Sequence, residues 1–205
     1  MALVLSIASE GRRFSSFTLL LAGVTINSMC MALILFLHYF ASLGQSLAIV
    51  RWLMGGIDAV AYPALGAILA ALAPALLLSL LLATDLNLLA VGEDWAASRG
   101  VSTQRTTLAC YLLGSYLAGS VTALTGPIAF VGLIVPHALR LAFGADHRLL
   151  LPCSFLVGAG FLAACDTVAR TLLAPTEIPV GVITSLLGGP FFIWLLKTRR
   201  SSLWL

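Results

Sequence analysis

The sequence predicts an all-α fold, a polytopic transmembrane helical bundle that forms a single domain over residues 1–205. Hydrophobic residues make up 60% of the chain and charged residues only 9%, and the mean hydropathy is +1.07. Soluble domains carry about 25% charged residues, because their surface must be wetted. The apolar residues also fall in runs close to the roughly 20 residues that a helix needs to cross a bilayer. A bilayer is therefore the expected solvent.

About six apolar runs are expected to form the spans. They are Phe17–Phe40, Tyr62–Ala83, Thr106–Thr125, Ile128–Phe143, Leu149–Ala169 and Val180–Lys197. The fourth run is short and contains Pro136, which favours a broken or tilted half-span. A proline inside a span frees a backbone carbonyl, and this is tolerated only against other helices or a wet cavity. Pro63 and Pro74 make the second run similar in this respect.

The basic residues indicate how the spans are oriented. If the spans alternate, one side receives nine basic residues: Arg12, Arg13, Arg99, Arg105, Arg140, Arg148, Lys197, Arg199 and Arg200. The other side receives only Arg51 and Arg170. Loops rich in lysine and arginine stay in the cytoplasm. The sequence therefore predicts an inner-membrane, multi-pass protein with a cytoplasmic C-terminus.

The longest polar segment, residues 84–105, is expected on the cytoplasmic side. Its apolar residues could line one face of short helices: Leu88, Leu89, Trp95 and Ala96. Gly92 and Gly100 are the expected helix breaks. A solvated surface loop is the alternative, but a tryptophan beside small residues favours a docking surface for another protein.

Three local charge patterns predict contacts at the two sides of the membrane. Glu93 and Asp94 are close enough to Arg99 in sequence to suggest a local ion pair. On the opposite side, residues 41–61 hold Arg51 and are expected to form a short interfacial helix. Asp166 and Arg170 are one helical turn apart. They form either a neutralising ion pair or a contact for a partner, and the residues alone do not choose between the two.

No catalytic, cofactor or metal site is predicted. The sequence lacks the HExxH, GxSxG and GxGxxG motifs and the GxxxxGK[ST] phosphate loop. Lys197 is the only lysine, so ATP-driven transport would need a separate ATPase subunit. His38, His137 and His147 are far apart in sequence, and the four cysteines contain no CxxC pair. Neither set has the spacing of metal ligands.

Seven segments, in order along the chain, resemble the FecCD-type permeases. They are LLLAG (19–23), RWLMGG (51–56), GEDWAASRGV (92–101), GPIAFVGLIVPHALR (126–140), DHRLLLP (146–152), ACDTVAR (164–170) and PTEIPVGVITSLLGGPFFIWLL (175–196). The family comprises the membrane subunits of ATP-binding-cassette importers for ferric siderophores, haem and vitamin B12. The resemblance implies a permease without enzymatic chemistry of its own, which carries an iron chelate, haem or cobalamin by alternating access.

The resemblance also implies partners and the residues that contact them. Such permeases form a homodimer or a pair, and they bind cytoplasmic ATPase subunits and a periplasmic or lipid-anchored substrate-binding protein. The segment that matches the ATPase-coupling helices contains Gly92, Glu93, Trp95, Ala96, Arg99 and Gly100. Arg170 matches an outward-facing arginine that pairs with a glutamate of the binding protein in the cobalamin member, and Arg51 is expected to dock beside it. Ser15, Ser16 and Thr18 match the start of the span that lines the pathway.

Family members have about ten spans, and this sequence begins where the fourth would end. The chain is therefore expected to be a truncated gene product, a protein with a mis-called start or one half of a split permease. Two other functions are alternatives. A secondary transporter would need no ATPase, but it usually keeps a charged residue near mid-membrane, whereas Asp166 and Glu177 lie towards the ends of their spans. The second alternative is a non-transporting remnant or an assembly protein.

Overall fold

The computed structural model describes the backbone of residues 16–201 and the side chains of residues 17–197, and within these ranges the chain is helical without strands. The helices are α2 (Ser16–Phe40), α3 (Leu43–Met54), α4 (Tyr62–Leu81), α5 (Ala83–Val91), α6 (Glu93–Ser98), α7 (Thr103–Thr125), α8 (Val131–Phe143), α9 (His147–Thr171) and α10 (Val180–Ser201). The predicted all-α class is confirmed.

Five of these helices, α2, α4, α7, α9 and α10, are long and apolar enough to cross a bilayer. The remaining predicted span is α8, which has only 13 residues. At 1.5 Å per residue it is about 20 Å long, against a hydrocarbon core of about 30 Å. Residues 126–130 precede it as a non-helical segment. The fourth predicted run is therefore a half-span, and residues 16–201 contain five full spans and one half.

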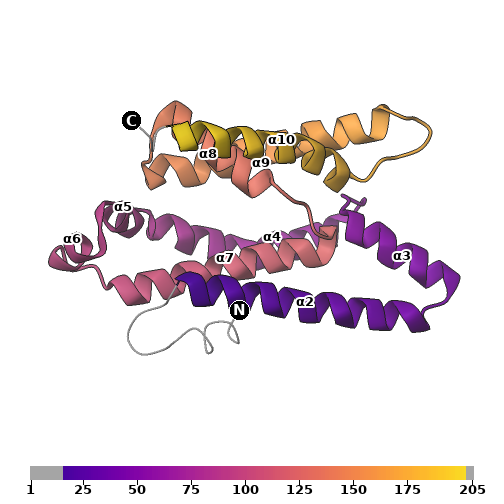
Figure 1. Ribbon diagram of the computed structural model, residues 1–205, viewed down its shortest axis with the longest axis horizontal. Helices are drawn as coiled ribbons and strands as arrows, with labels where there is room; N and C mark the ends of the chain where they lie inside the picture. Colours follow the sequence, from indigo (N-terminus) through magenta and orange to yellow (C-terminus); the bar gives the residue numbers. More distant parts are fainter. Residues whose placement is uncertain (1–15, 202–205) are drawn as a thin grey trace.

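The long helices lie side by side and connect two ends of the molecule (Figure 1). One end holds α3, residues 55–61 and residues 172–179, and it is called the Arg51 end below. The opposite end holds α5, α6 and the connection from α8 to α9, and it is called the α6 end. In Figure 1, α8, α9 and α10 form one group of helices, and α4 and α7 lie together in a second group. Arg51 and Arg170 lie at one end and Arg99, Arg105, Arg140 and Arg148 at the other, as the alternating spans predict.

Local sequence explains where several helices begin. Ser42 and Gln45 form a capping box at α3, in which the Ser42 N–H donates to Gln45 Oε1 at 2.9 Å. Pro63 lies in the first turn of α4, where a missing N–H costs nothing. Asp146 caps α9 by accepting the Arg148 N–H at 3.0 Å. The predicted short helix in residues 41–61 is present as α3.

The buried core is small for a chain of this length. One cluster contains Cys165, Ala169, Val180 and Ile183, and a second contains Val135, Leu139 and Leu150. By contrast, α2 buries only Ala22 among its described side chains. Apolar residues cover most of the outer faces of the helices. Such surfaces are stable only against lipid or further protein.

Glycines allow three segments to meet closely at the Arg51 end. A Cβ on Gly126 would overlap the carbonyl oxygen of Trp52, and a Cβ on Gly181 would overlap the carbonyl oxygen of Met54. The Gly181 N–H donates to the carbonyl oxygen of Gly55 at 3.2 Å. Only residues without a side chain permit this approach. The contacts hold the end of α3 against α7 and α10, and they position the charged residues described next.

Candidate functional site

Two arginines and three carboxylates meet in a cavity of about 370 Å³ at the Arg51 end. Arg51 comes from the last turn of α3 and Arg170 from the last turn of α9. Asp58, Asp166 and Glu177 also line the cavity. The structure therefore brings together the two arginines that the sequence analysis placed on the same side. This cavity is called the arginine cavity below.

Arg170 connects three segments of the chain. Its Nε donates to Asp166 Oδ2 at 2.8 Å, and its Nη2 donates to the carbonyl oxygen of Ile57 at 2.6 Å. Its Nη1 lies 3.8 Å from Glu177 Oε1, and 43% of the side chain remains exposed. The i,i+4 ion pair, one of the two interpretations of Asp166 and Arg170, is present. The guanidinium group is also accessible from outside, so the ion pair leaves the second interpretation open.

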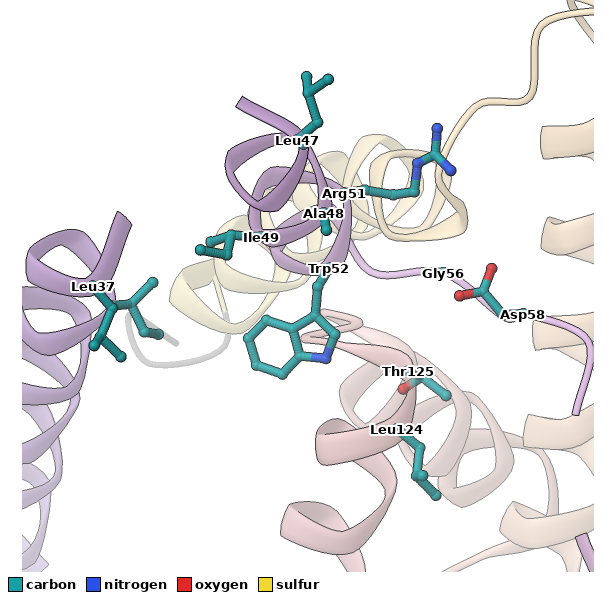
Figure 2. Close-up of a pocket in the computed structure, with 12 residues that line it drawn as sticks. Leu37, Leu47, Ala48, Ile49, Arg51, Trp52, Gly56, Asp58, Leu124 and Thr125 are labelled. Atoms are coloured by element: carbon teal, nitrogen blue, oxygen red, sulfur yellow. The ribbon is translucent and has the colours of Figure 1, made fainter. Parts of the chain in front are cut away.

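Arg51 differs from Arg170 because its side chain has no bonding partner among the described residues. It is exposed, and its side chain forms no hydrogen bond or ion pair with a residue within 17–197. Its guanidinium group points away from Leu37 and from the ring of Trp52, as Figure 2 shows. Arg51 is therefore a fixed positive charge that is available to an outside partner.

A larger cavity, of about 730 Å³, lies between α2, α3 and the end of α7. Leu37 faces it from α2, Leu47 and Trp52 from α3, and Leu124 and Thr125 from α7 (Figure 2). The Trp52 indole Nε1 donates to the carbonyl oxygen of Ala123 at 3.4 Å. This cavity is called the α3 cavity below.

The α3 cavity is suited to a bulky, mainly apolar guest, because pockets for organic ligands measure roughly 300–1,000 Å³ and are lined mostly by hydrophobic side chains. Its charged lining residues are Arg51 and Asp58. Sequence reasoning missed the cavity. α2 and α7 contribute mainly apolar residues about ninety positions apart, and no motif links them.

The α6 end presents a short helix pair. Gly92, with φ +153°, separates α5 from α6, as the glycine breaks predicted. Ala96 is fully buried, whereas Trp95 is 52% exposed. The Arg99 guanidinium carbon lies 5.2 Å from the centre of the Trp95 ring. The exposed Trp95 ring, next in sequence to the buried Ala96, gives this end an apolar surface.

The predicted ion pair between Arg99 and the acidic residues of this segment was wrong. Within residues 17–197 the ion pairs are those of Arg170, and Arg99 packs on Trp95 instead. The physical reason is the spacing of the charges along the chain. Glu93 and Asp94 lie in the first turn of α6 and Arg99 is its C-cap, so five or six residues separate the charges. Side chains meet across a helix at three or four residues.

The predicted pathway residues lie at the start of α2. Ser15 lies outside the described residues, and Ser16 begins α2 without a described side chain. Thr18 lies in the first turn of α2 and is half-buried. Their role in a pathway stays a prediction. Within the part of the chain that the structure describes, no group of three histidine, cysteine or acidic side chains converges as a metal site.

A bundle of bilayer-length apolar helices, with polar structure at both ends, is the architecture of a multi-pass membrane protein. The chain belongs to the FecCD transport family, whose family model matches residues 1–198. Members of this family are transport components rather than enzymes.

Individual relatives agree with the family match. The chain is 43% identical to the hemin transport system permease protein HmuU of Yersinia pestis over 182 residues, which cover 89% of this chain and 54% of the relative. It is 39% identical to the vitamin B12 import system permease protein BtuC of Klebsiella pneumoniae over 189 residues, 92% of this chain and 57% of the relative. The chain thus spans about half the length of the curated relatives it matches.

A solved structure shares the fold. It is an inward-facing conformation of a chain assigned as a metal-chelate type ABC transporter, with a TM-score of 0.83 and 34% sequence identity. The match covers 96% of this chain and 63% of that chain. The helix arrangement described above is therefore that of an ABC transporter permease.

Proposed function

We propose that this chain is the membrane permease subunit of an ATP-binding-cassette importer for haem, cobalamin or another metal chelate. The main support is the placement of two different contact surfaces at opposite ends of one bundle. An exposed arginine, Arg51, lies beside the arginine cavity at one end, and the apolar helix pair with Trp95 lies at the other. The family and the names of the relatives supply the substrate class.

In this proposal the α6 end faces the cytoplasm and the Arg51 end faces the outside of the inner membrane. The unequal number of arginines at the two ends supports this orientation. The ATPase would contact Gly92, Glu93, Trp95, Ala96, Arg99 and Gly100, and a periplasmic or lipid-anchored binding protein would dock at Arg51 and Arg170.

The proposed mechanism is alternating access driven by a partner. The chain itself supplies no covalent chemistry. ATP binding to the partner biases the bundle between two packings, since a ligand shifts an equilibrium only by its different affinity for the two states. The α3 cavity would receive part of the chelate on its way from the binding protein, because it lies between the arginine cavity and α2 and its walls are mainly apolar. A second copy of the permease, or a complementary membrane chain, would complete the pathway.

The first test is native mass spectrometry of the protein isolated from its own host membrane. Co-purification with an ATPase pair and a second membrane chain, or as part of a longer permease, supports the proposal. A single chain near 21.5 kDa without an ATPase contradicts it and favours the non-transporting alternative. Uptake into vesicles that is driven by a proton gradient without ATP would favour a secondary transporter instead.

Docking at the Arg51 end is tested best with Arg51→Glu. Since Arg51 forms no bond with another described side chain, reversing its charge leaves the local structure intact. The same change at Arg170 would also break the bonds to Asp166 and Ile57. We expect Arg51→Glu to slow association of the binding protein, because exposed charges at an interface act mainly on the association rate. Arg105→Glu, at the α6 end, is the control and should leave docking unchanged. Equal association rates for both variants would refute the assignment of Arg51.

A further inference from the structure

A polar joint connects α5, at the α6 end, to the first turn of α9. The Asn87 side-chain nitrogen donates to Asp146 Oδ1 at 2.6 Å. The Asn87 side-chain oxygen accepts the backbone N–H of His147 at 2.8 Å and lies 2.7 Å from His147 Nδ1. Because an amide oxygen can only accept, the Nδ1 contact places the ring proton of His147 on that nitrogen. Both polar atoms of Asn87 are therefore bound to α9 and its cap.

A second contact lies nearly one helical turn earlier on α5. Arg148 Nη2 donates to Thr84 Oγ1 at 3.3 Å. Thr84 and Asn87 are three residues apart, so they project from the same face of α5. Two contacts separated along a helix fix its direction as well as its position. Here α5 cannot tilt on α9 without breaking one of them.

The joint also occupies a particular place in the chain. At its far end, α5 leads through Gly92 directly into α6, which carries the exposed Trp95. On the other side, Asp146 is the N-cap of α9, and the last turn of α9 carries Arg170 into the arginine cavity. The joint thus lies on the covalent and hydrogen-bonded path from the α6 surface to the arginine cavity at the Arg51 end.

We propose that Asn87 is a positioning residue that fixes the α5–α6 pair to α9, so that displacement of α6 by a partner moves α9 instead of bending α5 away from it. This inference rests on the proposed function, in which the ATPase contacts α6. An N-cap alone would not need Asn87, because Asp146 already accepts the Arg148 N–H at 3.0 Å. The Asn87 amide adds only the connection between α5 and α9. A substitution at Asn87 can therefore test this connection while the Asp146 cap remains in place.

The test uses three variants in the assembled transporter isolated from its host. Asn87→Asp replaces the donor with a carboxylate, so the bond to Asp146 becomes a repulsion with little change of volume, while an acceptor for the His147 N–H is retained. Adding Asp146→Asn to it removes the like charge and returns one donor and one acceptor to the pair. Gln104→Glu is the matched control. It is also a change from amide to acid at the same end of the molecule, and Gln104 is exposed.

The measurement is uptake of radiolabelled haemin or cyanocobalamin into proteoliposomes per ATP hydrolysed, with the amount of co-purified ATPase as a check on assembly. We expect Asn87→Asp to lower this ratio about tenfold at unchanged assembly, which corresponds to the loss of one hydrogen bond to a charged group. The double variant should return to within about twofold of the wild type, since the two sites act as one unit. Gln104→Glu should match the wild type.

Three outcomes overturn the inference in distinguishable ways. If the wild type transports and Asn87→Asp transports equally well per ATP, the joint transmits nothing, while the proposed function stands. A wild-type preparation that neither contains an ATPase nor takes up either compound would overturn the proposed function, and the inference with it. A low ratio that the double variant does not restore also counts against the joint, because the loss would then arise elsewhere.

Discussion

Gly188, in the interior of α10, offers a sharp test of the packing between α10 and α8. The residue is buried, and a Cβ placed on it would overlap the Cβ and Cγ atoms of Phe130. Phe130 is the N-cap of α8 and has a positive φ of 67°, an uncommon conformation for a bulky residue. It cannot move away freely, because the atoms concerned are the root of its side chain rather than the tip. We therefore expect Gly188→Ala to displace the start of α8.

The size of this effect follows from comparison with a second glycine. Gly160, in the interior of α9, has no atom within 4 Å of its ideal Cβ position. Both substitutions gain about 1 kcal/mol of helix propensity, so the difference between them isolates the steric cost. Overpacking costs about 1–3 kcal/mol. A difference of about 2 kcal/mol in unfolding free energy corresponds to roughly 4–8 °C in Tm for a chain of this size.

The assay is the apparent Tm of the purified chain in detergent, measured for the wild type and both variants under one set of conditions. Gly160→Ala should melt at or above the wild-type temperature, and Gly188→Ala should melt several degrees below Gly160→Ala. Equal melting temperatures for the two variants would refute the steric reasoning.

A double variant tests whether Phe130 is the cause. Phe130→Gly removes the obstructing side chain, and glycine adopts a positive φ without strain. In that background Gly188→Ala should lose its steric penalty, so that the two effects are not additive. If Gly188→Ala costs as much without Phe130 as with it, the contact between α8 and α10 is not the reason for the loss.

Three further substitutions act on single polar groups. The Arg148 N–H and the Asn87 amide both donate to the Asp146 carboxylate at the start of α9, and these bonds lower its pKa. The ionised carboxylate therefore stabilises the fold above the unfolded pKa of about 3.9. This stabilisation is lost as the pH falls through the lower folded pKa. Asp146→Asn should therefore flatten the decline of Tm below pH 4, and an unchanged acid profile would contradict this. Trp52→Phe removes the 3.4 Å bond to the Ala123 carbonyl, worth about 1 kcal/mol, together with part of the apolar ring, so it should lower the Tm; an unchanged Tm would show that neither contact stabilises the fold. Among the described residues, the buried Ser154 hydroxyl has no hydrogen-bond partner, so Ser154→Ala should raise the Tm, and a decrease would reveal a partner for that hydroxyl.

Much of the fold could be predicted from the sequence, because a bilayer places strict demands on a helix. Every backbone polar group in a span must be bonded within the segment, so length and hydropathy alone indicate where spans lie. The predicted runs Phe17–Phe40 and Val180–Lys197 match described spans closely. The half-span was foreseen from Pro136 and the short apolar run. The start of α8 was not foreseen from the sequence. The chain stays non-helical through Phe130, whose side chain packs against Gly188 of α10.

The site was predicted less completely, because its geometry depends on contacts that are distant in sequence. Counting the spans predicted that Arg51 and Arg170 lie on the same side of the membrane. The span count did not predict the bond from Arg170 to Ile57, which is 113 residues away in sequence. The ion pair expected at Arg99 failed for a local reason: five or six residues separate Arg99 from Asp94 and Glu93, more than the three or four at which helical side chains meet.

The sequence by itself determined that this protein is a multi-pass helical membrane protein, where its spans lie, and which family it resembles. Composition and periodicity are local properties, and the bilayer converts them directly into structure. Only the tertiary structure decided which cation remains available at the Arg51 end, where the α3 cavity lies, and that Asn87 joins α5 to α9. Each of these depends on side chains from separate helices meeting at hydrogen-bond or van der Waals distance, and no local pattern in the chain encodes such a meeting.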